Sequence, residues 1–400
     1  MTKQLFLSLF ALCFSLVSCG QEKPLWCNSC SDAPRTQSLR LCFYNMENFF
    51  DTEDDSLKQD DAFTPSGEYH WDNKKFYHKA NQIAKVILAM GGPEPPEIIG
   101  VAEIENEKVL QTLLYQTPLK RFHYRYVHYD SPDPRGIDVA LLYRSDKFQV
   151  FESEVIPVQY SATGARSRDV LYVKGAAVAS MGQAAAGASA GSSSGSFVGS
   201  SAGKSASASA SGSATDGAVP EVASTDTLHL FIVHFTSRYS GYKATISRRN
   251  YVAGLLRSRI DTILSRQPNA SIVATGDFND APTDSSALFY LGASLDPQRM
   301  KEGELLNLMY FFVDKNQVGT HKYQRQWSIL DQMVVTPAMW RGESPYYIKE
   351  PACIFSMPFM LVEDEKYLGN KPFRTYVGRK YQGGFSDHLP IFVDLYFHGK

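Results

Sequence analysis

Two short stretches, Gly276-Asp277-Phe278-Asn279 and Ser386-Asp387-His388, place carboxylate, amide and imidazole groups at fixed points of a 400-residue sequence. The first stretch follows the apolar run Ser271–Thr275, which has the composition of a buried strand. A strand covered on both faces avoids charged groups in its middle, so Asp277 and Asn279 are expected where the strand ends. Functional groups of α/β sheets gather at strand ends, which predicts an α/β protein with a polar site at one rim.

The same pattern recurs along the chain, because several apolar runs end within a residue or two in a polar group. Asn45 and Glu47 follow the first predicted strand, Glu103 follows the second, and His234 follows the fifth. One such residue is usually a turn or cap, but the repetition favours a shared site. A rim of acids, amides and imidazoles is typical of a metal-dependent hydrolytic site. The predicted strands are Leu39–Tyr44, Ile98–Ala102, Ile137–Tyr143, Val170–Val173, Leu228–Val233, Ser271–Thr275, Gln332–Val335 and Ile391–Tyr396.

Two longer segments have helical spacing of their apolar residues. The first is Lys74–Met90, with Gly91 as its stop signal, and the second is Ala244–Ser265. The polar side of the second helix carries several arginines, which are interpreted as solvated surface. These arginines are Arg248, Arg249, Arg257 and Arg259.

The composition is that of a folded globular protein. Hydrophobic residues make up 44% of the chain and charged residues 20%, which excludes a disordered or collagen-like protein. The chain has 40 Lys and Arg against 42 Asp and Glu, a net charge of −2, which excludes a uniformly basic nucleic-acid coat protein. A local basic groove remains compatible with this total.

The N-terminus reads as an export signal. Residues 1–18 contain one positive charge and an apolar run that is too short to anchor in a bilayer. The following Leu16-Val17-Ser18-Cys19-Gly20 resembles a lipobox, so we expect lipidation of Cys19 and a tether over residues 19–38. This predicts an exported lipoprotein held at the outer membrane; an ordinary secretory signal, giving a periplasmic or secreted protein, is the alternative.

A second low-complexity segment interrupts the body of the chain. Between Met181 and Ala214, 29 of 34 residues are Ala, Gly or Ser, which leaves almost nothing to bury. We expect a disordered insertion over about residues 176–224 that lengthens a hairpin connection. The alternative, a linker between two domains, is disfavoured because the polar residues of the predicted site lie on both sides of it. Residues 39–400 are therefore interpreted as one domain.

Other chemistries lack their motifs. The sequence has no Gly-x-Ser-x-Gly elbow, no Walker loop, no His-Glu-x-x-His and no Gly-x-Gly-x-x-Gly. The pair Cys27 and Cys30 has no second Cys-x-x-Cys or nearby His to complete a zinc site, and it is interpreted as an exposed disulfide or two thiols.

Taken in order, the motifs resemble the endonuclease/exonuclease/phosphatase superfamily, and specifically an exported bacterial member of it. They are Asn45, Val101-Ala102-Glu103-Ile104-Glu105-Asn106, Gly276-Asp277-Phe278-Asn279, Leu330-Asp331-Gln332-Met333 and Ser386-Asp387-His388. The superfamily includes DNase I-like nucleases, apurinic endonucleases, sphingomyelinases and inositol polyphosphate 5-phosphatases. The resemblance covers the chain apart from the leader, tether and insertion. It implies a DNase I-like four-layered α/β/β/α sandwich, in which two packed mixed β-sheets lie between helices.

A metal ion is implied by the chemistry of phosphodiester cleavage, in which negative charge grows on the phosphate oxygens. Glu103 is the best ligand candidate, and its hard carboxylate oxygen favours Mg²⁺ or Mn²⁺ over zinc. By resemblance, Asn45 and Asp387 would help to hold this cation or its waters.

The resemblance also assigns the remaining roles. Asp277 would orient and deprotonate the attacking water, and Asn279 would bind a phosphate oxygen or a second ion. His234 and His388 would flank the phosphate and donate hydrogen bonds, and Asp331 would pair with His388.

Further acids have weaker support. The segment Arg135-Gly136-Ile137-Asp138 resembles the family segment that supplies a carboxylate to the other histidine, so Asp138 is the candidate partner of His234; a turn residue is the alternative. Glu47 and Glu105 are interpreted as surface acids, with a place behind Asn45 and Glu103 as the alternative.

The substrate is expected to be a phosphodiester, with nucleic acid as the first choice. Arg166, Arg168, Arg238 and Lys243 are the candidates for a short basic groove, and Arg166 and Arg168 match a basic spot in relatives. The prediction is an extracytoplasmic endonuclease that cuts DNA or RNA. The alternatives are a sphingomyelinase-like or inositol-phosphate phosphoesterase on the same fold, and a non-catalytic surface-binding lipoprotein. No protein partner is predicted.

Overall fold

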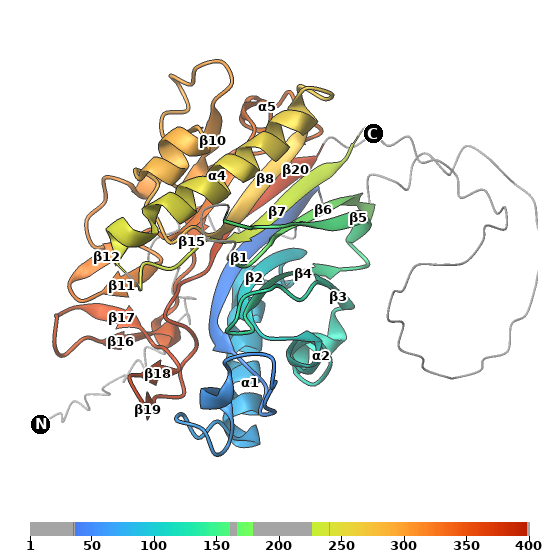
Figure 1. Cartoon of the computed structure of the whole chain (residues 1–400). Coiled ribbons are helices and arrows are strands. Elements are labelled where there is room, and N and C mark those ends of the chain that lie inside the picture. The colour runs from blue at the N-terminus through green and yellow to red at the C-terminus, as the bar shows by residue number, and fades with distance from the viewer. Residues whose placement is uncertain (1–34, 36, 161–165, 179–225, 240, 398–400) are drawn as a thin grey trace, which may run out of the picture.

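The computed structural model describes residues 35, 37–160, 166–178, 226–239 and 241–397 (Figure 1). The predicted leader and tether up to residue 34, the lipidation site Cys19, the pair Cys27 and Cys30, and residues 179–225 of the predicted insertion lie outside the described residues. Within the described part of the chain, none of the helices has the length and apolar character needed to cross a membrane.

Two seven-stranded sheets form the centre of the protein. The first has the order β14-β20-β1-β2-β4-β3, with β15 also paired to β20, and the second has the order β5-β6-β7-β8-β13-β10-β9. Both are mixed, because β1 and β2 are parallel while β1 and β20 are antiparallel, and β7 and β8 are parallel while β8 and β13 are antiparallel.

The first sheet consists of β1 (Ser38–Phe49), β2 (Ile98–Ile104), β3 (Tyr124–His128), β4 (Asp138–Arg144), β14 (Tyr346–Tyr347), β15 (Cys353–Ile354) and β20 (Ile391–Phe397). The second consists of β5 (Phe148–Ile156), β6 (Val170–Ala177), β7 (Leu228–His234), β8 (Ser271–Asp277), β9 (Ala293–Ser294), β10 (Leu305–Asn307) and β13 (Asp331–Val335).

Helices cover the outer faces of both sheets, with α1 and α2 on one side and α4 on the other (Figure 1). The predicted four-layered α/β/β/α sandwich is therefore confirmed. Helix α1 spans Asn73–Gly91, begins at the Asp72 cap, and ends at Gly92, whose φ of 69° suits glycine. The other helices are α2 (Glu107–Tyr115), α4 (Tyr242–Leu264), α5 (Pro337–Arg341), η1 (Asp61–Phe63), η2 (Pro118–Arg121), η3 (Ser286–Tyr290), η4 (Leu308–Phe312) and η5 (Pro358–Met360).

The side-chain alternation of β7 shows how this packing positions the site. Leu228, Leu230 and Ile232 belong to the large core that includes the space between the sheets, whereas Phe231 and Val233 pack in the smaller core under α4. Successive strand residues point to opposite faces. His234, the next residue in the first series, therefore faces the other sheet.

Three two-stranded hairpins lie beside the sandwich, on the side where β11, β12 and β16 to β19 are labelled (Figure 1). They are β11 (His321–Tyr323) with β12 (Gln326–Ser328), β16 (Leu361–Glu363) with β17 (Asn370–Pro372), and β18 (Tyr376–Val377) with β19 (Lys380–Tyr381). The sequence patterns did not indicate these hairpins, nor α2, β3 or β5.

The strands on either side of residues 179–225 are neighbours in one sheet. β6 continues to Ala177, two residues into the predicted insertion, and β7 begins at Leu228. The two strands are antiparallel, and Gly175 lies opposite Leu228. A hairpin connection, as predicted, is what this register requires.

Candidate active site

Three polar residues lie side by side across the second sheet. His234 on β7 is the register partner of Asp277 on β8, and Asp277 is the partner of Asp331 on β13. The residue before Asp277 has to be glycine, because a Cβ on Gly276 would lie 2.0 Å from the carbonyl oxygen of Val233. β7 and β8 approach closely at Gly276, and the next residues on the two strands, His234 and Asp277, therefore lie directly beside each other.

The first sheet contributes Asn45 and Glu103 to the same place. The Asn45 Nδ2 donates to Glu103 Oε1 at 3.2 Å and to Asp277 Oδ2 at 3.1 Å. The second of these hydrogen bonds joins the two sheets. The site is therefore built at the end of the sandwich, between facing strands, as the strand-end pattern predicted.

Glu103 and Asn279 both have left-handed backbones, with φ of 59° and 49°. Such values cost non-glycine residues free energy and persist where the surrounding structure fixes them. At Asn279 the Asp277 side chain does so: Asp277 Oδ1 accepts from Asn279 N, and Asp277 Oδ2 accepts from Asn279 Nδ2. Asn279 therefore holds Asp277 in place in this structure.

His388 is paired with Asp331, as predicted. Its Nδ1 lies 2.7 Å from Asp331 Oδ2, and its backbone N donates to Ser386 Oγ, which in turn donates to the Asn45 carbonyl oxygen. Burial by itself would lower the pKa of His388, but the negative charges of Asp331 and Asp277 outweigh it and hold the pKa well above its usual range. The two carboxylates therefore favour the protonated form of this imidazole.

Asp277 lies between the two histidines. Its Oδ2 is 3.6 Å from His234 Nε2 and 3.9 Å from His388 Nε2. Burial raises the pKa of Asp277 to about 7, while the positive charge of His388 opposes the rise and Asp331 adds to it. A carboxyl group with this pKa can accept a proton at neutral pH.

His234 is buried and has a different environment from His388. Burial lowers its pKa well below the usual range, and the charge of Arg168 acts in the same direction. Its Nε2 faces Glu103 and Asp277, while its Nδ1 is buried and has no hydrogen-bond partner among the described residues. Burial and Arg168 therefore favour the neutral form of His234.

The predicted pairing of Asp138 with His234 is wrong in this structure. Asp138 Oδ2 lies 2.9 Å from His128 Nε2, and Asp138 Oδ1 accepts from Ser131 N. His128 is on the adjacent strand β3, and it binds the Asp138 carboxylate in place of His234. Asp138 therefore orients His128.

The cluster of Glu103, His234 and Asp277 could hold a metal ion, because one ligand atom from each lies within 4.8 Å of the others. Glu103 and Asp277 offer hard oxygen ligands, and among the described residues neither carboxylate has a Lys or Arg within 4.0 Å. Two acids this close repel each other, so a divalent cation fits here.

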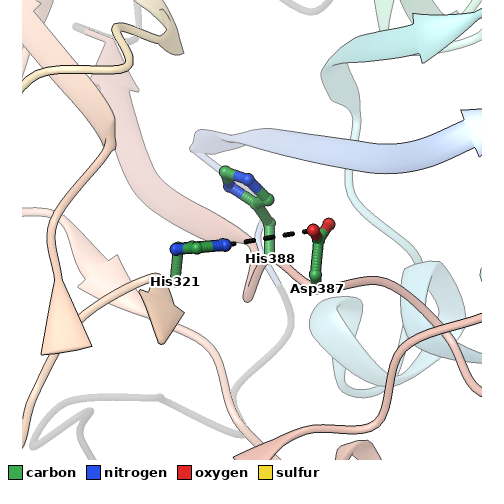
Figure 2. Close-up of side chains that lie close together, drawn as sticks. All are labelled: His321, Asp387 and His388. Carbon is green, nitrogen blue, oxygen red and sulfur yellow. Dashed lines mark ion pairs between the residues drawn. The ribbon is translucent and has the colours of Figure 1, made fainter. Parts of the chain in front are cut away.

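Asp387 does not share that cluster. Its Oδ2 lies 2.9 Å from Arg374 Nη2, and its other neighbours are His321 and His388. Figure 2 shows His321 and Asp387 on either side of His388, with Asp387 Oδ2 3.9 Å from His321 Nε2. Burial would raise the pKa of Asp387, but Arg374 and His388 hold it well below its usual range. That Asp387 contacts the same cation as Glu103 stays a prediction.

A family model described as the endonuclease/exonuclease/phosphatase family matches residues 40–181 and 218–396. The chain belongs to the endonuclease/exonuclease/phosphatase family. The family is one of phosphoric ester hydrolases. Its members typically depend on a divalent metal, in keeping with the cluster at Glu103.

Solved structures agree with this fold. An endonuclease/exonuclease/phosphatase family protein from Bacteroides thetaiotaomicron is 15% identical, with a TM-score of 0.50 over 91% of this chain and 99% of that chain. A mannosyl-6-phosphatase from the same species (16% identity, TM-score 0.49, 90% and 100% covered) and the human Nocturnin catalytic domain (14%, 0.49, 90% and 95%) are also similar. At these identities the likeness shows the fold alone. Among curated proteins, no sequence matches the chain.

The predicted substrate arginines of this family member lie in different surroundings. Arg168 is buried, and its guanidinium donates to the carbonyl oxygens of His234 and Phe235 and pairs with Asp133 at 2.7 Å. It therefore supports the His234 loop, because each of its three side-chain nitrogens bonds to protein. The expected phosphate contact of Arg168 stays a prediction.

Arg238 and Arg166 lie nearer to solvent. Arg238 pairs with Asp280 at 3.0 Å and with Asp284 at 2.6 Å, so its charge is already neutralised. Arg166 is exposed and lies 3.8 Å from Asp169, which leaves it accessible for a substrate. Lys243 at the start of α4 is exposed as well.

Several charged residues predicted at the surface are buried. Glu47 contacts Arg374 at 3.0 Å and Lys79 at 4.0 Å. Its backbone φ of 49° lies in the irregular part of β1 between Asn45 and Phe49, so the regular alternation of faces does not extend from Asn45 to Glu47. Glu105 is buried, and its Oε2 accepts a hydrogen bond from the backbone N of Asp51. No local sequence pattern indicates these partners.

Other functional neighbours were missed altogether. Arg249 on α4 is fully buried against Asp280 at 2.7 Å and is not solvated surface. His321 and Arg374 both contact Asp387. His321 lies on strand β11 and Arg374 lies between β17 and β18, and neither belongs to a recognised motif. Only their order on the chain, just before Asp331 and Ser386, could have drawn attention to them.

Proposed function

We propose that the chain is a divalent-metal-dependent phosphodiester hydrolase, namely an extracytoplasmic endonuclease that cuts DNA or RNA by in-line attack of water. The observation that carries the proposal is the position of Asp277, whose Oδ2 lies within 3.9 Å of imidazole nitrogens of both His234 and His388. A proton acceptor and two hydrogen-bonding groups around one point are what hydrolysis of a phosphoester requires.

Asp277 takes the role of the base. Its pKa of about 7 lets it accept the proton of a water molecule near neutral pH, and Asn45 and Asn279 fix its orientation through Nδ2 hydrogen bonds. The water is thereby directed along the line of attack while its proton leaves for Asp277.

His388 stabilises the charge that grows on the phosphate. Its Nδ1 is engaged by Asp331, so the proton on Nε2 points toward Asp277 and the space beside it. As a cation it donates a charge-assisted hydrogen bond to a non-bridging oxygen. The neutral His234 contributes a second, weaker hydrogen bond from the opposite side.

Mg²⁺ or Mn²⁺ would be held by the Glu103 carboxylate, beside the base Asp277, and when present would polarise the phosphoryl group. The oxygen donors of Glu103, together with the absence of cysteine from the three-residue cluster, favour these hard ions.

The test is hydrolysis of bis(p-nitrophenyl) phosphate, duplex DNA and RNA by the protein from residue 35 onward, which keeps β1 and the Arg35–Glu97 ion pair, with Mg²⁺ and with EDTA. We expect turnover with Mg²⁺, loss with EDTA, and loss in Asp277→Asn. Asp314→Asn, an exposed aspartate, is the matched control and should keep wild-type rates. A complete lack of turnover with any divalent ion would contradict the proposal.

A small phosphoester, such as an inositol or sugar phosphate, is the second candidate substrate. It is favoured by the cavity of about 360 Å³ that Arg374 and Asp387 line, which has the size of a small-molecule site. Release of inorganic phosphate from a monoester, with duplex DNA left intact, would favour this candidate.

We also propose that Cys19 anchors the enzyme to the outer membrane through a lipid, with free export as the alternative. The support is the Leu16-Val17-Ser18-Cys19 stretch after an apolar run. Cell fractionation of wild type and Cys19→Ala tests it: the wild type should be in the membrane fraction and the variant in a soluble one. Equal distribution of both would contradict lipidation.

A further inference from the structure

A cavity of about 360 Å³ lies next to the catalytic centre, between the hairpins β11–β12 and β16–β17. Arg374 and Asp387 line it, and their side chains are 2.9 Å apart. Asp387 directly precedes His388, which the proposed function places against the reacting phosphate. A molecule bound in this cavity would therefore lie next to that phosphate. Figure 1 places these hairpins one beside the other at this end of the sandwich.

The lining carries an excess of positive charge. Its basic residues are Lys322, Lys366, Lys371 and Arg374, and its acids are Asp364 and Asp387. Glu47, 3.0 Å from Arg374, is a third acid behind the lining, so four positive charges stand against three negative ones. Asp364 is shared by Lys322 at 3.0 Å and Lys371 at 3.4 Å. One carboxylate thus pairs with two ammonium groups, which leaves a net positive charge. This charge would attract an anion into the cavity.

Lys366 supplies the most available of these charges. It is exposed at the turn of β16–β17, and within the described chain no carboxylate lies within 4.0 Å of its Nζ. The Nζ lies 5.0 Å from the centre of the Tyr367 ring. Tyr323, whose exposed fraction is 70%, faces the same cavity from β11 and adds a phenol group. Ammonium and phenol donors together match phosphate oxygens.

We propose that this basic pocket, formed by Lys322, Tyr323, Lys366, Lys371 and Arg374, binds a second, non-reacting phosphate group of the substrate. The inference rests on the proposed hydrolase function and narrows its substrate class to phosphoesters that carry more than one phosphate. The second phosphate comes either from the neighbouring nucleotide of a nucleic-acid strand or from a small polyphosphorylated molecule. In both cases the pocket fixes the distance from the reacting phosphate to the anchored one.

The test compares substrates that differ only in a second phosphate. One pair is the dithymidine dinucleotide with and without a 5′-phosphate; the other is myo-inositol 1,4-bisphosphate and myo-inositol 1-phosphate. We expect kcat/KM to be about tenfold higher for the doubly phosphorylated member of one pair, as expected for one charge-assisted contact. The pair that shows the preference identifies the source of the phosphate.

The double variant Lys366→Gln/Lys371→Gln should bring this ratio of kcat/KM close to one. Lys366→Gln alone, which removes a charge without a carboxylate partner, should lower the ratio while the protein stays folded by circular dichroism. Lys120→Gln changes an exposed lysine that does not line the cavity and should alter neither the ratio nor the basal rate.

A ratio near one in the wild type, or an unchanged ratio in the double variant, overturns the pocket proposal while turnover of bis(p-nitrophenyl) phosphate leaves the hydrolase in place. If no substrate is turned over, the hydrolase fails and the pocket is tested by calorimetric titration with inorganic pyrophosphate. Saturable binding that the double variant weakens about tenfold supports the pocket, and no binding overturns it.

Discussion

At the residue scale, the pair of His388 and Asp331 carries the sharpest prediction. His388→Ala should lower kcat by about 10²- to 10⁴-fold, because it removes a cation that Asp331 holds 2.7 Å away and that faces Asp277. Asp331→Asn should have a smaller effect in the same direction, since the imidazole remains but loses its charge. Rates on bis(p-nitrophenyl) phosphate measure both, and His78→Ala, an exposed histidine on α1, is the control. An unchanged kcat in His388→Ala would remove it from the site.

The motifs allowed the central residues to be predicted, but not their surroundings. Asn45, Glu103 and Asp277 meet as expected, because the strands that carry them end at one place in any sandwich of this topology. Partner choice is decided by tertiary packing. His128 outcompetes His234 for Asp138 because β3 lies directly beside β4, and nothing local in the sequence records this pairing.

Arg374 gives a second prediction at this scale. It contacts Glu47 at 3.0 Å and Asp387 at 2.9 Å, so Arg374→Gln leaves two largely buried carboxylates with less compensation. The free energy of unfolding should fall by about 2 kcal/mol at pH 7, less than for a fully buried pair because the Arg374 side chain is 39% exposed. Arg379→Gln, whose partner Glu68 is on the surface, should change it by less than about 0.5 kcal/mol. Urea denaturation measures both; equal effects would contradict the argument.

At the element scale, β7 contains a histidine that makes stability depend on pH. Burial lowers the pKa of His229 to about 4, and its Nδ1 lies 2.8 Å from the Tyr172 hydroxyl. The unfolded chain protonates at about 6.5, so it binds more protons than the folded protein between these two values. The contribution of His229 to stability is therefore present above pH 6.5 and is lost as the pH falls toward 4.

The loss from His229 should be roughly 2 kcal/mol between pH 7 and pH 5. Urea denaturation of wild type and His229→Phe at both values measures it, and the variant should lack this part of the pH dependence. Parallel pH profiles for the two proteins would show that His229 does not titrate as its burial indicates.

Elements were predictable in proportion to their length and burial. β7 and β8 are seven-residue strands, mostly apolar and buried throughout, and the sequence pattern predicted their bounds within a residue or two. The hairpins β11–β12 and β16–β17 have three residues on each strand and mostly half-buried side chains, so the strands are too short to leave a periodic signal. The basic pocket lies between those hairpins, so the sequence pattern could not predict which residues line it.

At the scale of the whole molecule, the site belongs to the interface of the two sheets. Asn45 on the first sheet donates to Asp277 on the second, so catalysis requires the sandwich to be assembled. Residues 179–225 interrupt the chain between β6 and β7, which nonetheless pair within one sheet. Residues 179–225 therefore separate β6 from β7 in the sequence, although the two strands are neighbours in the sheet.

This arrangement predicts that residues 179–225 can be replaced by the short linker Gly-Asn-Gly-Ser. Because Gly175 lies opposite Leu228, a short connection is long enough to join the end of β6 to the start of β7. Shortening the loop reduces the entropy of closure and should raise the free energy of unfolding by about 2 kcal/mol. Urea denaturation and hydrolysis of bis(p-nitrophenyl) phosphate measure the outcome, with a Gly/Ser replacement of the original length as the control. A destabilised or inactive short variant beside a normal control would show that the strands need the longer connection.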